Sequence, residues 1–358
     1  MEGKPSLKEE SSEERKLSAR EYLIGRSIKL DIIGDKDNSY EANYKALSEF
    51  SAELLADTIK RLNKDETKQR IVLGLAADTS PVGMYKEFAR IREEQKIDLS
   101  KIFIVRYEQG YGPDVVRGGD FDFDAFHEQM FFEANDIEPR PAEIIQTPEG
   151  QKVEGNFLAM FKEYKGDEDK AKIEEVVERF ENVLKILGNI DFAVMGLGKD
   201  GHIIDWGRFE KGFQIRKTRE KTPEEYDKNY KRFEGEESYR NYMWSDILKL
   251  GEEITGKQKE EVEEGLKTTA TLGIGHIIKA DEVVIIAPQE TKDEAVKEAV
   301  YGSVSGDIID LKTGNKIGSL LRDKSLRNPA ASVISVRNIL NKKTRLVVTP
   351  ESARKLSL

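Results

Sequence analysis

Apolar and polar positions along this chain follow two spacings, one typical of buried strands and one typical of helices. Short apolar runs predict strands at residues 28–33, 71–75, 102–105, 192–195, 282–287, 331–336 and 345–348. Apolar residues recur at helical spacing over 44–62 and 173–187, and a further helix is predicted to begin near Pro81. Strands that alternate with helices predict an α/β fold, namely a three-layer, doubly wound, Rossmann-like and mainly parallel sheet with helices on both faces.

Two segments depart from this pattern. Residues 1–25 are highly charged and contain few apolar side chains, which predicts a mobile tail. Residues 26–358 are expected to form a single α/β domain. Within it, residues 211–267 are rich in charge and irregular in pattern, and we expect an insertion or lid there.

Composition excludes several classes of function. The chain has 358 residues, a net charge of −10 and no cysteine. The negative charge argues against nucleic acid or an anionic membrane as the main partner, and disulfides and thiolate chemistry are excluded. No apolar run is long enough to span a membrane, and the N-terminus lacks the apolar segment of a secretory signal. We therefore expect a cytoplasmic protein with a small-molecule partner, and a homo-oligomer remains open.

The loop after the strand at 192–195 is the strongest candidate for chemistry. Glycines surround Asp200 and His202, and ligands of open α/β sheets bind outside the carboxyl ends of strands. This aspartate and histidine are candidates for an acid/base pair. His127 is interpreted as structural, and His276 either lines the pocket or packs in the core. No metal is expected, because no two histidines lie at ligand spacing and there is no thiolate.

Polar residues also follow two other strands. The run Ala77-Asp78-Thr79-Ser80 precedes a helix, where it either holds an anion or simply caps the helix through Asp78 or Ser80. Glu108 is a candidate general base or a solvated loop residue. Lys292 and Arg232 are candidates for binding an anionic substrate group, with surface cations as the alternative.

Taken in order, these motifs resemble the glucosamine-6-phosphate deaminase/isomerase family, which shares its fold with 6-phosphogluconolactonases. Residues 73–85 read L-G-L-A-A-D-T-S-P-V-G-M-Y and are similar to the family's phosphate loop, L-G-L-(A/P)-T-G-(S/G)-T-P-x-x-x-Y. Residues 196–203 resemble its G-I-G-x-D-G-H-I motif. The similarity extends over about residues 28–355 and includes segments at 126–137, 272–292 and 328–332. The isoleucine after His202 and the Gly-Ile-Gly at 273–275 favour the deaminase branch.

The resemblance implies roles for the candidate residues. Glu108 stands where the family has the aspartate that moves a proton between C1 and C2 of the sugar. Asp200 and His202 match the pair that opens the ring and handles protons, and Lys292 and Arg232 match phosphate ligands. The sequence also departs from the family. Ala77 and Asp78 replace a threonine and a glycine of the phosphate loop, and only Asp205 could replace the glutamate that orients the histidine.

The expected function is acid/base aldose–ketose isomerisation of a sugar phosphate or related acidic sugar in carbohydrate metabolism, with or without deamination. No metal or nucleotide cofactor is expected. One alternative is a hydrolase of the 6-phosphogluconolactonase type, in which His202 would activate water. Another is a sugar-binding regulatory protein whose pocket has lost its chemistry, since Ala77, Asp78 and Glu108 all depart from the family pattern.

Overall fold

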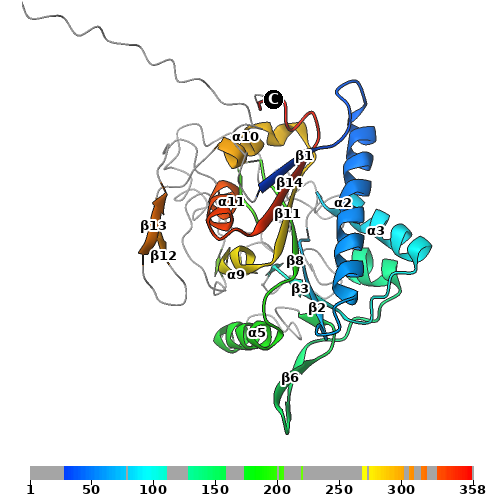
Figure 1. Cartoon of the computed structure of the whole chain (residues 1–358), viewed down its shortest axis with the longest axis vertical. Coiled ribbons are helices and arrows are strands. Elements are labelled where there is room, and N and C mark those ends of the chain that lie inside the picture. Colours follow the sequence, from blue (N-terminus) through cyan, green and yellow to red (C-terminus); the bar gives the residue numbers. More distant parts are fainter. Residues whose placement is uncertain are drawn as a thin grey trace, which may run out of the picture.

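A seven-stranded sheet forms the centre of the chain, and every neighbouring pair of its strands is parallel (Figure 1). The computed structural model describes residues 28–77, 80–110, 128–158, 173–199, 201–204, 219–220, 268–271, 274–301, 306–309, 316–320 and 329–356. In spatial order the strands are β1 (Ile28–Ile32), β14 (Lys343–Val348), β11 (Glu282–Ala287), β8 (Phe192–Gly196), β2 (Ile71–Leu75), β3 (Ile102–Arg106) and β7 (Phe157–Leu158).

Helices cover both faces of this sheet (Figure 1). Successive strand residues point to opposite faces, so the sheet contributes to two cores. In β2, for example, Val72 belongs to one buried cluster and Leu73 to the other. The three-layer arrangement predicted from the sequence is confirmed. The helices on the Leu73 side are α2 (Tyr40–Asn63) and α3 (Val82–Gln95), and those on the Val72 side are α5 (Ile173–Leu187), α9 (Ile274–Lys279), α10 (Asp293–Tyr301) and α11 (Pro329–Ile339).

Smaller elements connect or flank these layers. A three-stranded sheet has the order β4–β10–β9, and two antiparallel hairpins, β5–β6 and β12–β13, stand apart from the main sheet. A short 3-10 helix, η4 (Glu290–Lys292), precedes α10. The remaining bounds are β4 (Glu108–Gly110), β5 (Glu143–Thr147), β6 (Gly150–Glu154), β9 (Arg219–Glu220), β10 (Thr268–Thr271), β12 (Gly306–Ile309), β13 (Lys316–Leu320), the π-helix η1 (Glu128–Phe132) and the 3-10 helix η2 (Glu133–Asn135).

One predicted strand is wrong. The short apolar run at residues 331–336 predicts a strand. They lie instead within α11, whose buried side chains Ala330, Val333, Ile334 and Arg337 follow helical spacing. Tertiary packing of this face against α9 and α10 overrides the local β-propensity.

Arg337 explains how α11 is anchored. Its side chain is fully buried, and its guanidinium donates hydrogen bonds to backbone carbonyls at the end of α9 and the start of β14, and to the hydroxyl of Thr344. Burial lowers the pKa of Arg337 to about 10, and the nearby Asp281 and Glu282 carboxylates oppose that shift. A buried cation is tolerated here because carbonyl oxygens surround it.

The strand order reverses between β2 and β8. From β2, the sheet continues through β3 and β7 on one side, and through β8, β11 and β14 on the other. Asp191 joins β2 and β8 at their amino ends. Its carboxylate accepts a hydrogen bond from the backbone N–H of Val72 at 2.8 Å and pairs with Lys68. The opposite, carboxyl edge at this reversal is where open α/β sheets bind ligands.

Two expectations on domain organisation lie outside the described residues. These are the tail at 1–25 and, apart from β9, the insertion at 211–267, so the division into domains stays a prediction. Across the parts of the chain that the structure describes, no helix is both long and apolar enough to cross a membrane.

Candidate active site

Loops that follow four neighbouring strands carry the candidate residues at the carboxyl edge of the sheet. Ala77 and Ser80 follow β2, and Glu108 lies in β4 directly after β3. His202 follows β8, and Lys292 follows β11 in the turn η4. Because all four strands are parallel, these loops emerge at one edge. The expectation that separate motifs converge at this edge is consistent with that topology.

The best defined contact in the site joins Lys292 to Ser80. The ammonium group of Lys292 donates to the hydroxyl oxygen of Ser80 at 2.8 Å, and the two residues are 6% and 1% exposed. The residue that caps α3 is Pro81, which makes no side-chain capping bond. The hydroxyl of Ser80 thus accepts a hydrogen bond from a buried cation instead of capping the helix. A buried ammonium beside the loop that starts a helix is suited to meeting an anion.

The C-terminal turn holds the segment that carries Lys292. Thr349 donates its hydroxyl to the carbonyl of Pro288, and Ser352 donates to the carbonyl of Ala287. The next residue after Lys292 is Asp293, which is buried and pairs with Arg354 and Lys355 from the same turn. Arg354 and Lys355 therefore neutralise the carboxylate of Asp293 without the charge of Lys292. The backbone around Lys292 is held before it, at Ala287 and Pro288, and after it, at Asp293.

Tyr44 supports the loop after β2 from helix α2. Its phenolic oxygen accepts the backbone N–H of Gly83 at 2.9 Å and donates to the carbonyl of Ser80 at 3.4 Å. In the sequence, Tyr44 is visible only as one of the apolar positions of an amphipathic helix. No local signal could reveal this contact, because it depends on how α2 packs against α3.

His202 lies in a tight glycine turn after β8. The backbone N–H of Gly198 donates to the carbonyl of His202 at 2.8 Å, and Gly201 adopts a positive φ of 84°. A Cβ atom at position 198 would lie 2.2 Å from two atoms of the imidazole ring, so the ring packs directly on the glycine backbone. The carbonyl of Gly201 also accepts the backbone N–H of Ala330 at the start of α11. This turn fixes the half-buried imidazole.

The other candidates are placed less completely. Glu108 pairs with Thr271 through the antiparallel β4–β10 ladder, which fixes its backbone position, and its side chain lies outside the described part. His276 is half-buried in α9. No cluster of metal-binding side chains occurs among the described residues. Asp78, Thr79, Asp200, Asp205, Arg232 and His127 lie outside the described residues.

Comparison with known proteins points to one group of enzymes. The chain is 26% identical over 268 residues to the glucosamine-6-phosphate deaminase of Clostridium perfringens strain 13, covering 74% of this chain and 87% of the relative. It is also 26% identical over 266 residues to that of Thermoanaerobacter sp. strain X514, covering 74% of this chain and 82% of the relative. No protein-family model matches the chain.

Solved structures extend the similarity to the fold. A monomeric glucosamine-6-phosphate deaminase superposes with a TM-score of 0.55 at 16% identity, covering 91% of this chain and 99% of that one. The 6-phosphogluconolactonase of Trypanosoma cruzi superposes with a TM-score of 0.52 at 11% identity, covering 92% and 97%. The chain is therefore similar in sequence to glucosamine-6-phosphate deaminases, and it has the α/β fold that these enzymes share with 6-phosphogluconolactonases.

Proposed function

We propose that this chain is a sugar-phosphate deaminase/isomerase, acting on an amino-sugar phosphate of the glucosamine 6-phosphate type. The observation that carries the proposal is the buried contact between Lys292 and Ser80, at the edge of the sheet where His202 also emerges. The sequence similarity to enzymes of that name supports the choice of substrate.

In the proposed reaction, the substrate's phosphate binds at Lys292 and the loop of Ala77, Asp78, Thr79 and Ser80, with Arg232 as a second cation. Ammonium and guanidinium groups bind phosphate through charge-assisted hydrogen bonds. A helix start adds backbone N–H groups, and α3 begins directly after this loop, where the N–H of Gly83 is already held by Tyr44. The phosphate would anchor the sugar so that its C1 and C2 atoms reach the loops after β3 and β8.

The chemistry is then a proton transfer followed by hydrolysis. Asp200 and His202, with Asp205 orienting the histidine, would open the sugar ring to the C1 aldehyde. Glu108 would remove the proton from C2 and return it to C1, while the C1 oxygen takes a proton from the substrate's ammonium group; a C1 hydroxyl and a C2 iminium result. Water adds to that carbon and ammonia departs, so glucosamine 6-phosphate and water give fructose 6-phosphate and ammonia. None of these steps calls for a metal ion or a nucleotide.

The direct experiment is a substrate panel with purified protein. Glucosamine 6-phosphate should yield ammonia and fructose 6-phosphate in equal amounts, and unphosphorylated glucosamine should react far more slowly. Replacement of Glu108 by Gln should lower turnover about 10²-fold or more. Glu94→Gln, a change on the exposed face of α3, is the matched control and should leave turnover unchanged.

Two alternatives are separated by the same panel. Hydrolysis of 6-phosphogluconolactone without ammonia release would favour a lactonase, a reading supported by the shared fold. Thermal stabilisation by glucosamine 6-phosphate without turnover would indicate a sugar-binding regulatory protein. A cytoplasmic location is part of the proposal, because a phosphorylated sugar carries charge that disfavours passage through a membrane. Homo-oligomerisation stays open.

A further inference from the structure

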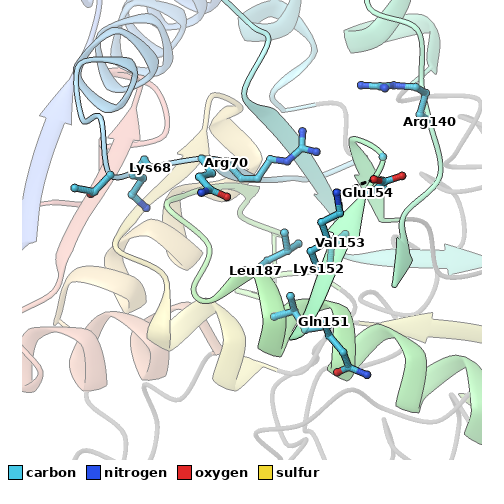
Figure 2. A pocket seen from close by; sticks show the side chains of 12 residues that line it. Lys68, Arg70, Arg140, Gln151, Lys152, Val153, Glu154 and Leu187 are labelled. Atoms are coloured by element: carbon cyan, nitrogen blue, oxygen red, sulfur yellow. Dashed lines mark ion pairs between the residues drawn. The ribbon is translucent and has the colours of Figure 1, made fainter. Parts of the chain in front are cut away.

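A cavity of about 850 Å³ lies at the opposite edge of the sheet from the candidate active site. Residues 67–70, which lead directly into the amino end of β2, form one wall. The hairpin strand β6 forms another wall, and the last residues of α5 form the floor (Figure 2). A five-residue strand spans roughly 16 Å, so this cavity is separated from the loops at the carboxyl edge by the length of the sheet.

Cationic side chains dominate the charge of this cavity. Lys68, Arg70, Arg140 and Lys152 line it, and Glu154 is the one carboxylate among its lining residues. Lys68 is paired with Asp191, and Lys152 is paired with Glu154 at 3.0 Å. Neither Arg70 nor Arg140 pairs its guanidinium with any described carboxylate. Two uncompensated guanidinium groups therefore face one cavity in a chain of net charge −10.

The rest of the lining is neutral. Ile186 and Leu187, at the end of α5, and Val153, on β6, supply apolar surface. Gln69 and Gln151 add amide groups that can donate and accept hydrogen bonds. Cavities of roughly 300 to 1,000 Å³ with apolar surface and a few placed polar groups are typical of small-molecule sites. A ligand that fits this lining has one anionic end and a neutral body.

We propose that this cavity is a second ligand site, which binds an organic phosphate of nucleotide size. In the view of Figure 2, the side chains of Arg70 and Arg140 extend toward one another from opposite walls. Guanidinium groups bind phosphate oxygens bidentately, so the phosphate would lie between them. The neutral body of the ligand would then cover Ile186 and Leu187. This site is independent of the function proposed above.

Calorimetric titration tests the proposal with AMP, UMP and phenyl phosphate, each compared with its unphosphorylated partner adenosine, uridine or phenol. At least one phosphate should bind saturably and at least tenfold more tightly than its neutral partner. Arg70→Gln and Arg140→Gln should each weaken that binding at least tenfold. Arg90→Gln is the matched control, because Arg90 lies on α3 and pairs only with Glu87 and Glu94 among the described residues; it should leave the affinity unchanged.

Hydrogen exchange supplies an independent readout, because a bound phosphate should protect residues 67–70 and 150–155. Thermal unfolding of each variant checks that the fold is retained. Failure of all three phosphates to bind would overturn the proposal. Equal binding of a phosphate and its neutral partner would overturn it as well. So would full affinity in Arg70→Gln or Arg140→Gln, because the phosphate would then be held elsewhere, for instance at Lys292.

Discussion

The side chains of Lys292 and Ser80 meet at 2.8 Å, although 212 positions separate them in the sequence. One residue follows β11 and the other follows β2, and β8 lies between these strands in the sheet. The contact therefore bridges the loop of the intervening strand, from which His202 emerges. This geometry is the basis for proposing an anion site at the carboxyl edge of the sheet.

Removal of the hydroxyl group should show what this contact contributes. Ser80→Ala leaves the buried ammonium of Lys292 without one of its hydrogen bonds, and we expect the free energy of unfolding to fall by about 1.5 to 3 kcal/mol. The KM for a phosphorylated substrate should rise. Ser100→Ala removes a solvent-exposed hydrogen bond to Asp98; as the control, it should lower stability far less and leave KM unchanged. Denaturant unfolding and steady-state kinetics measure both effects, and an unchanged KM would argue against a phosphate at Ser80.

Two glycines allow a contrast between a catalytic and a structural effect. A methyl group at Gly198 would collide with the ring of His202, with 2.2 Å to the nearest ring atoms. We expect Gly198→Ala to displace the imidazole. This variant should show a large loss of kcat and only a small loss in the free energy of unfolding. In Gly74→Ala the new methyl group would meet the hydroxyl of Tyr107, a buried core residue, at 2.3 Å. That variant should mainly lose stability, and similar kcat values for the two variants would contradict the role of the Gly198 turn.

Arg337 should contribute strongly to the stability of the fold. Arg337→Met removes the donors that satisfy carbonyls of α9 and β14 in a fully buried position. The cost should reach roughly 3 to 5 kcal/mol, because buried acceptors lose their partners. Arg90→Met, on the surface of α3, should have little effect. Urea unfolding monitored by circular dichroism tests this, and equal midpoints for the two variants would contradict it.

Stability should also decline in acid through Glu294. Hydrogen bonds from Lys297, which has the larger effect, and from Lys355 hold the pKa of Glu294 below its ordinary value of 4.5. A carboxyl whose pKa is lower in the folded state stabilises the fold above the unfolded pKa, and this contribution is lost as pH falls through the folded pKa. The difference in unfolding free energy between wild type and Glu294→Gln should therefore shrink below pH 4.5. If this difference in unfolding free energy stayed constant as the pH falls below 4.5, the ion pairs of Glu294 would not be its source.

Apolar periodicity predicted most of the fold because the parallel strands are buried on both faces and therefore read as continuous apolar runs. The strands at 71–75 and 282–287 and the helix at 173–187 are observed with the predicted bounds. The error at α11 arose because Val333 and Ile334 favour strands locally, whereas packing against α9 and α10 fixes a helix.

Long-range contacts set the limit of prediction for the site. The glycine turn at His202 was visible in the sequence, because closely spaced glycines after a strand have a local cause. The supporting contacts from Tyr44 and from the C-terminal turn at Ser352 were not visible, since they depend on tertiary packing. The cavity at Arg70 and Arg140 was also missed, because its walls come from separate parts of the chain. The roles of Glu108, Asp200, Asp205 and Arg232 stay predictions.

The most direct test of the central claim compares two lysines on neighbouring turns. Lys292→Ala should raise the KM for glucosamine 6-phosphate by roughly tenfold or more, as expected when a charged hydrogen bond to phosphate is lost. Activity on unphosphorylated glucosamine should change little. Lys297→Ala, which removes a half-buried lysine paired with Glu294, should match the wild type on both substrates. Equal losses on the phosphorylated and unphosphorylated sugars, or ammonia release unaffected by Lys292→Ala, would contradict an anion site at Lys292 and Ser80.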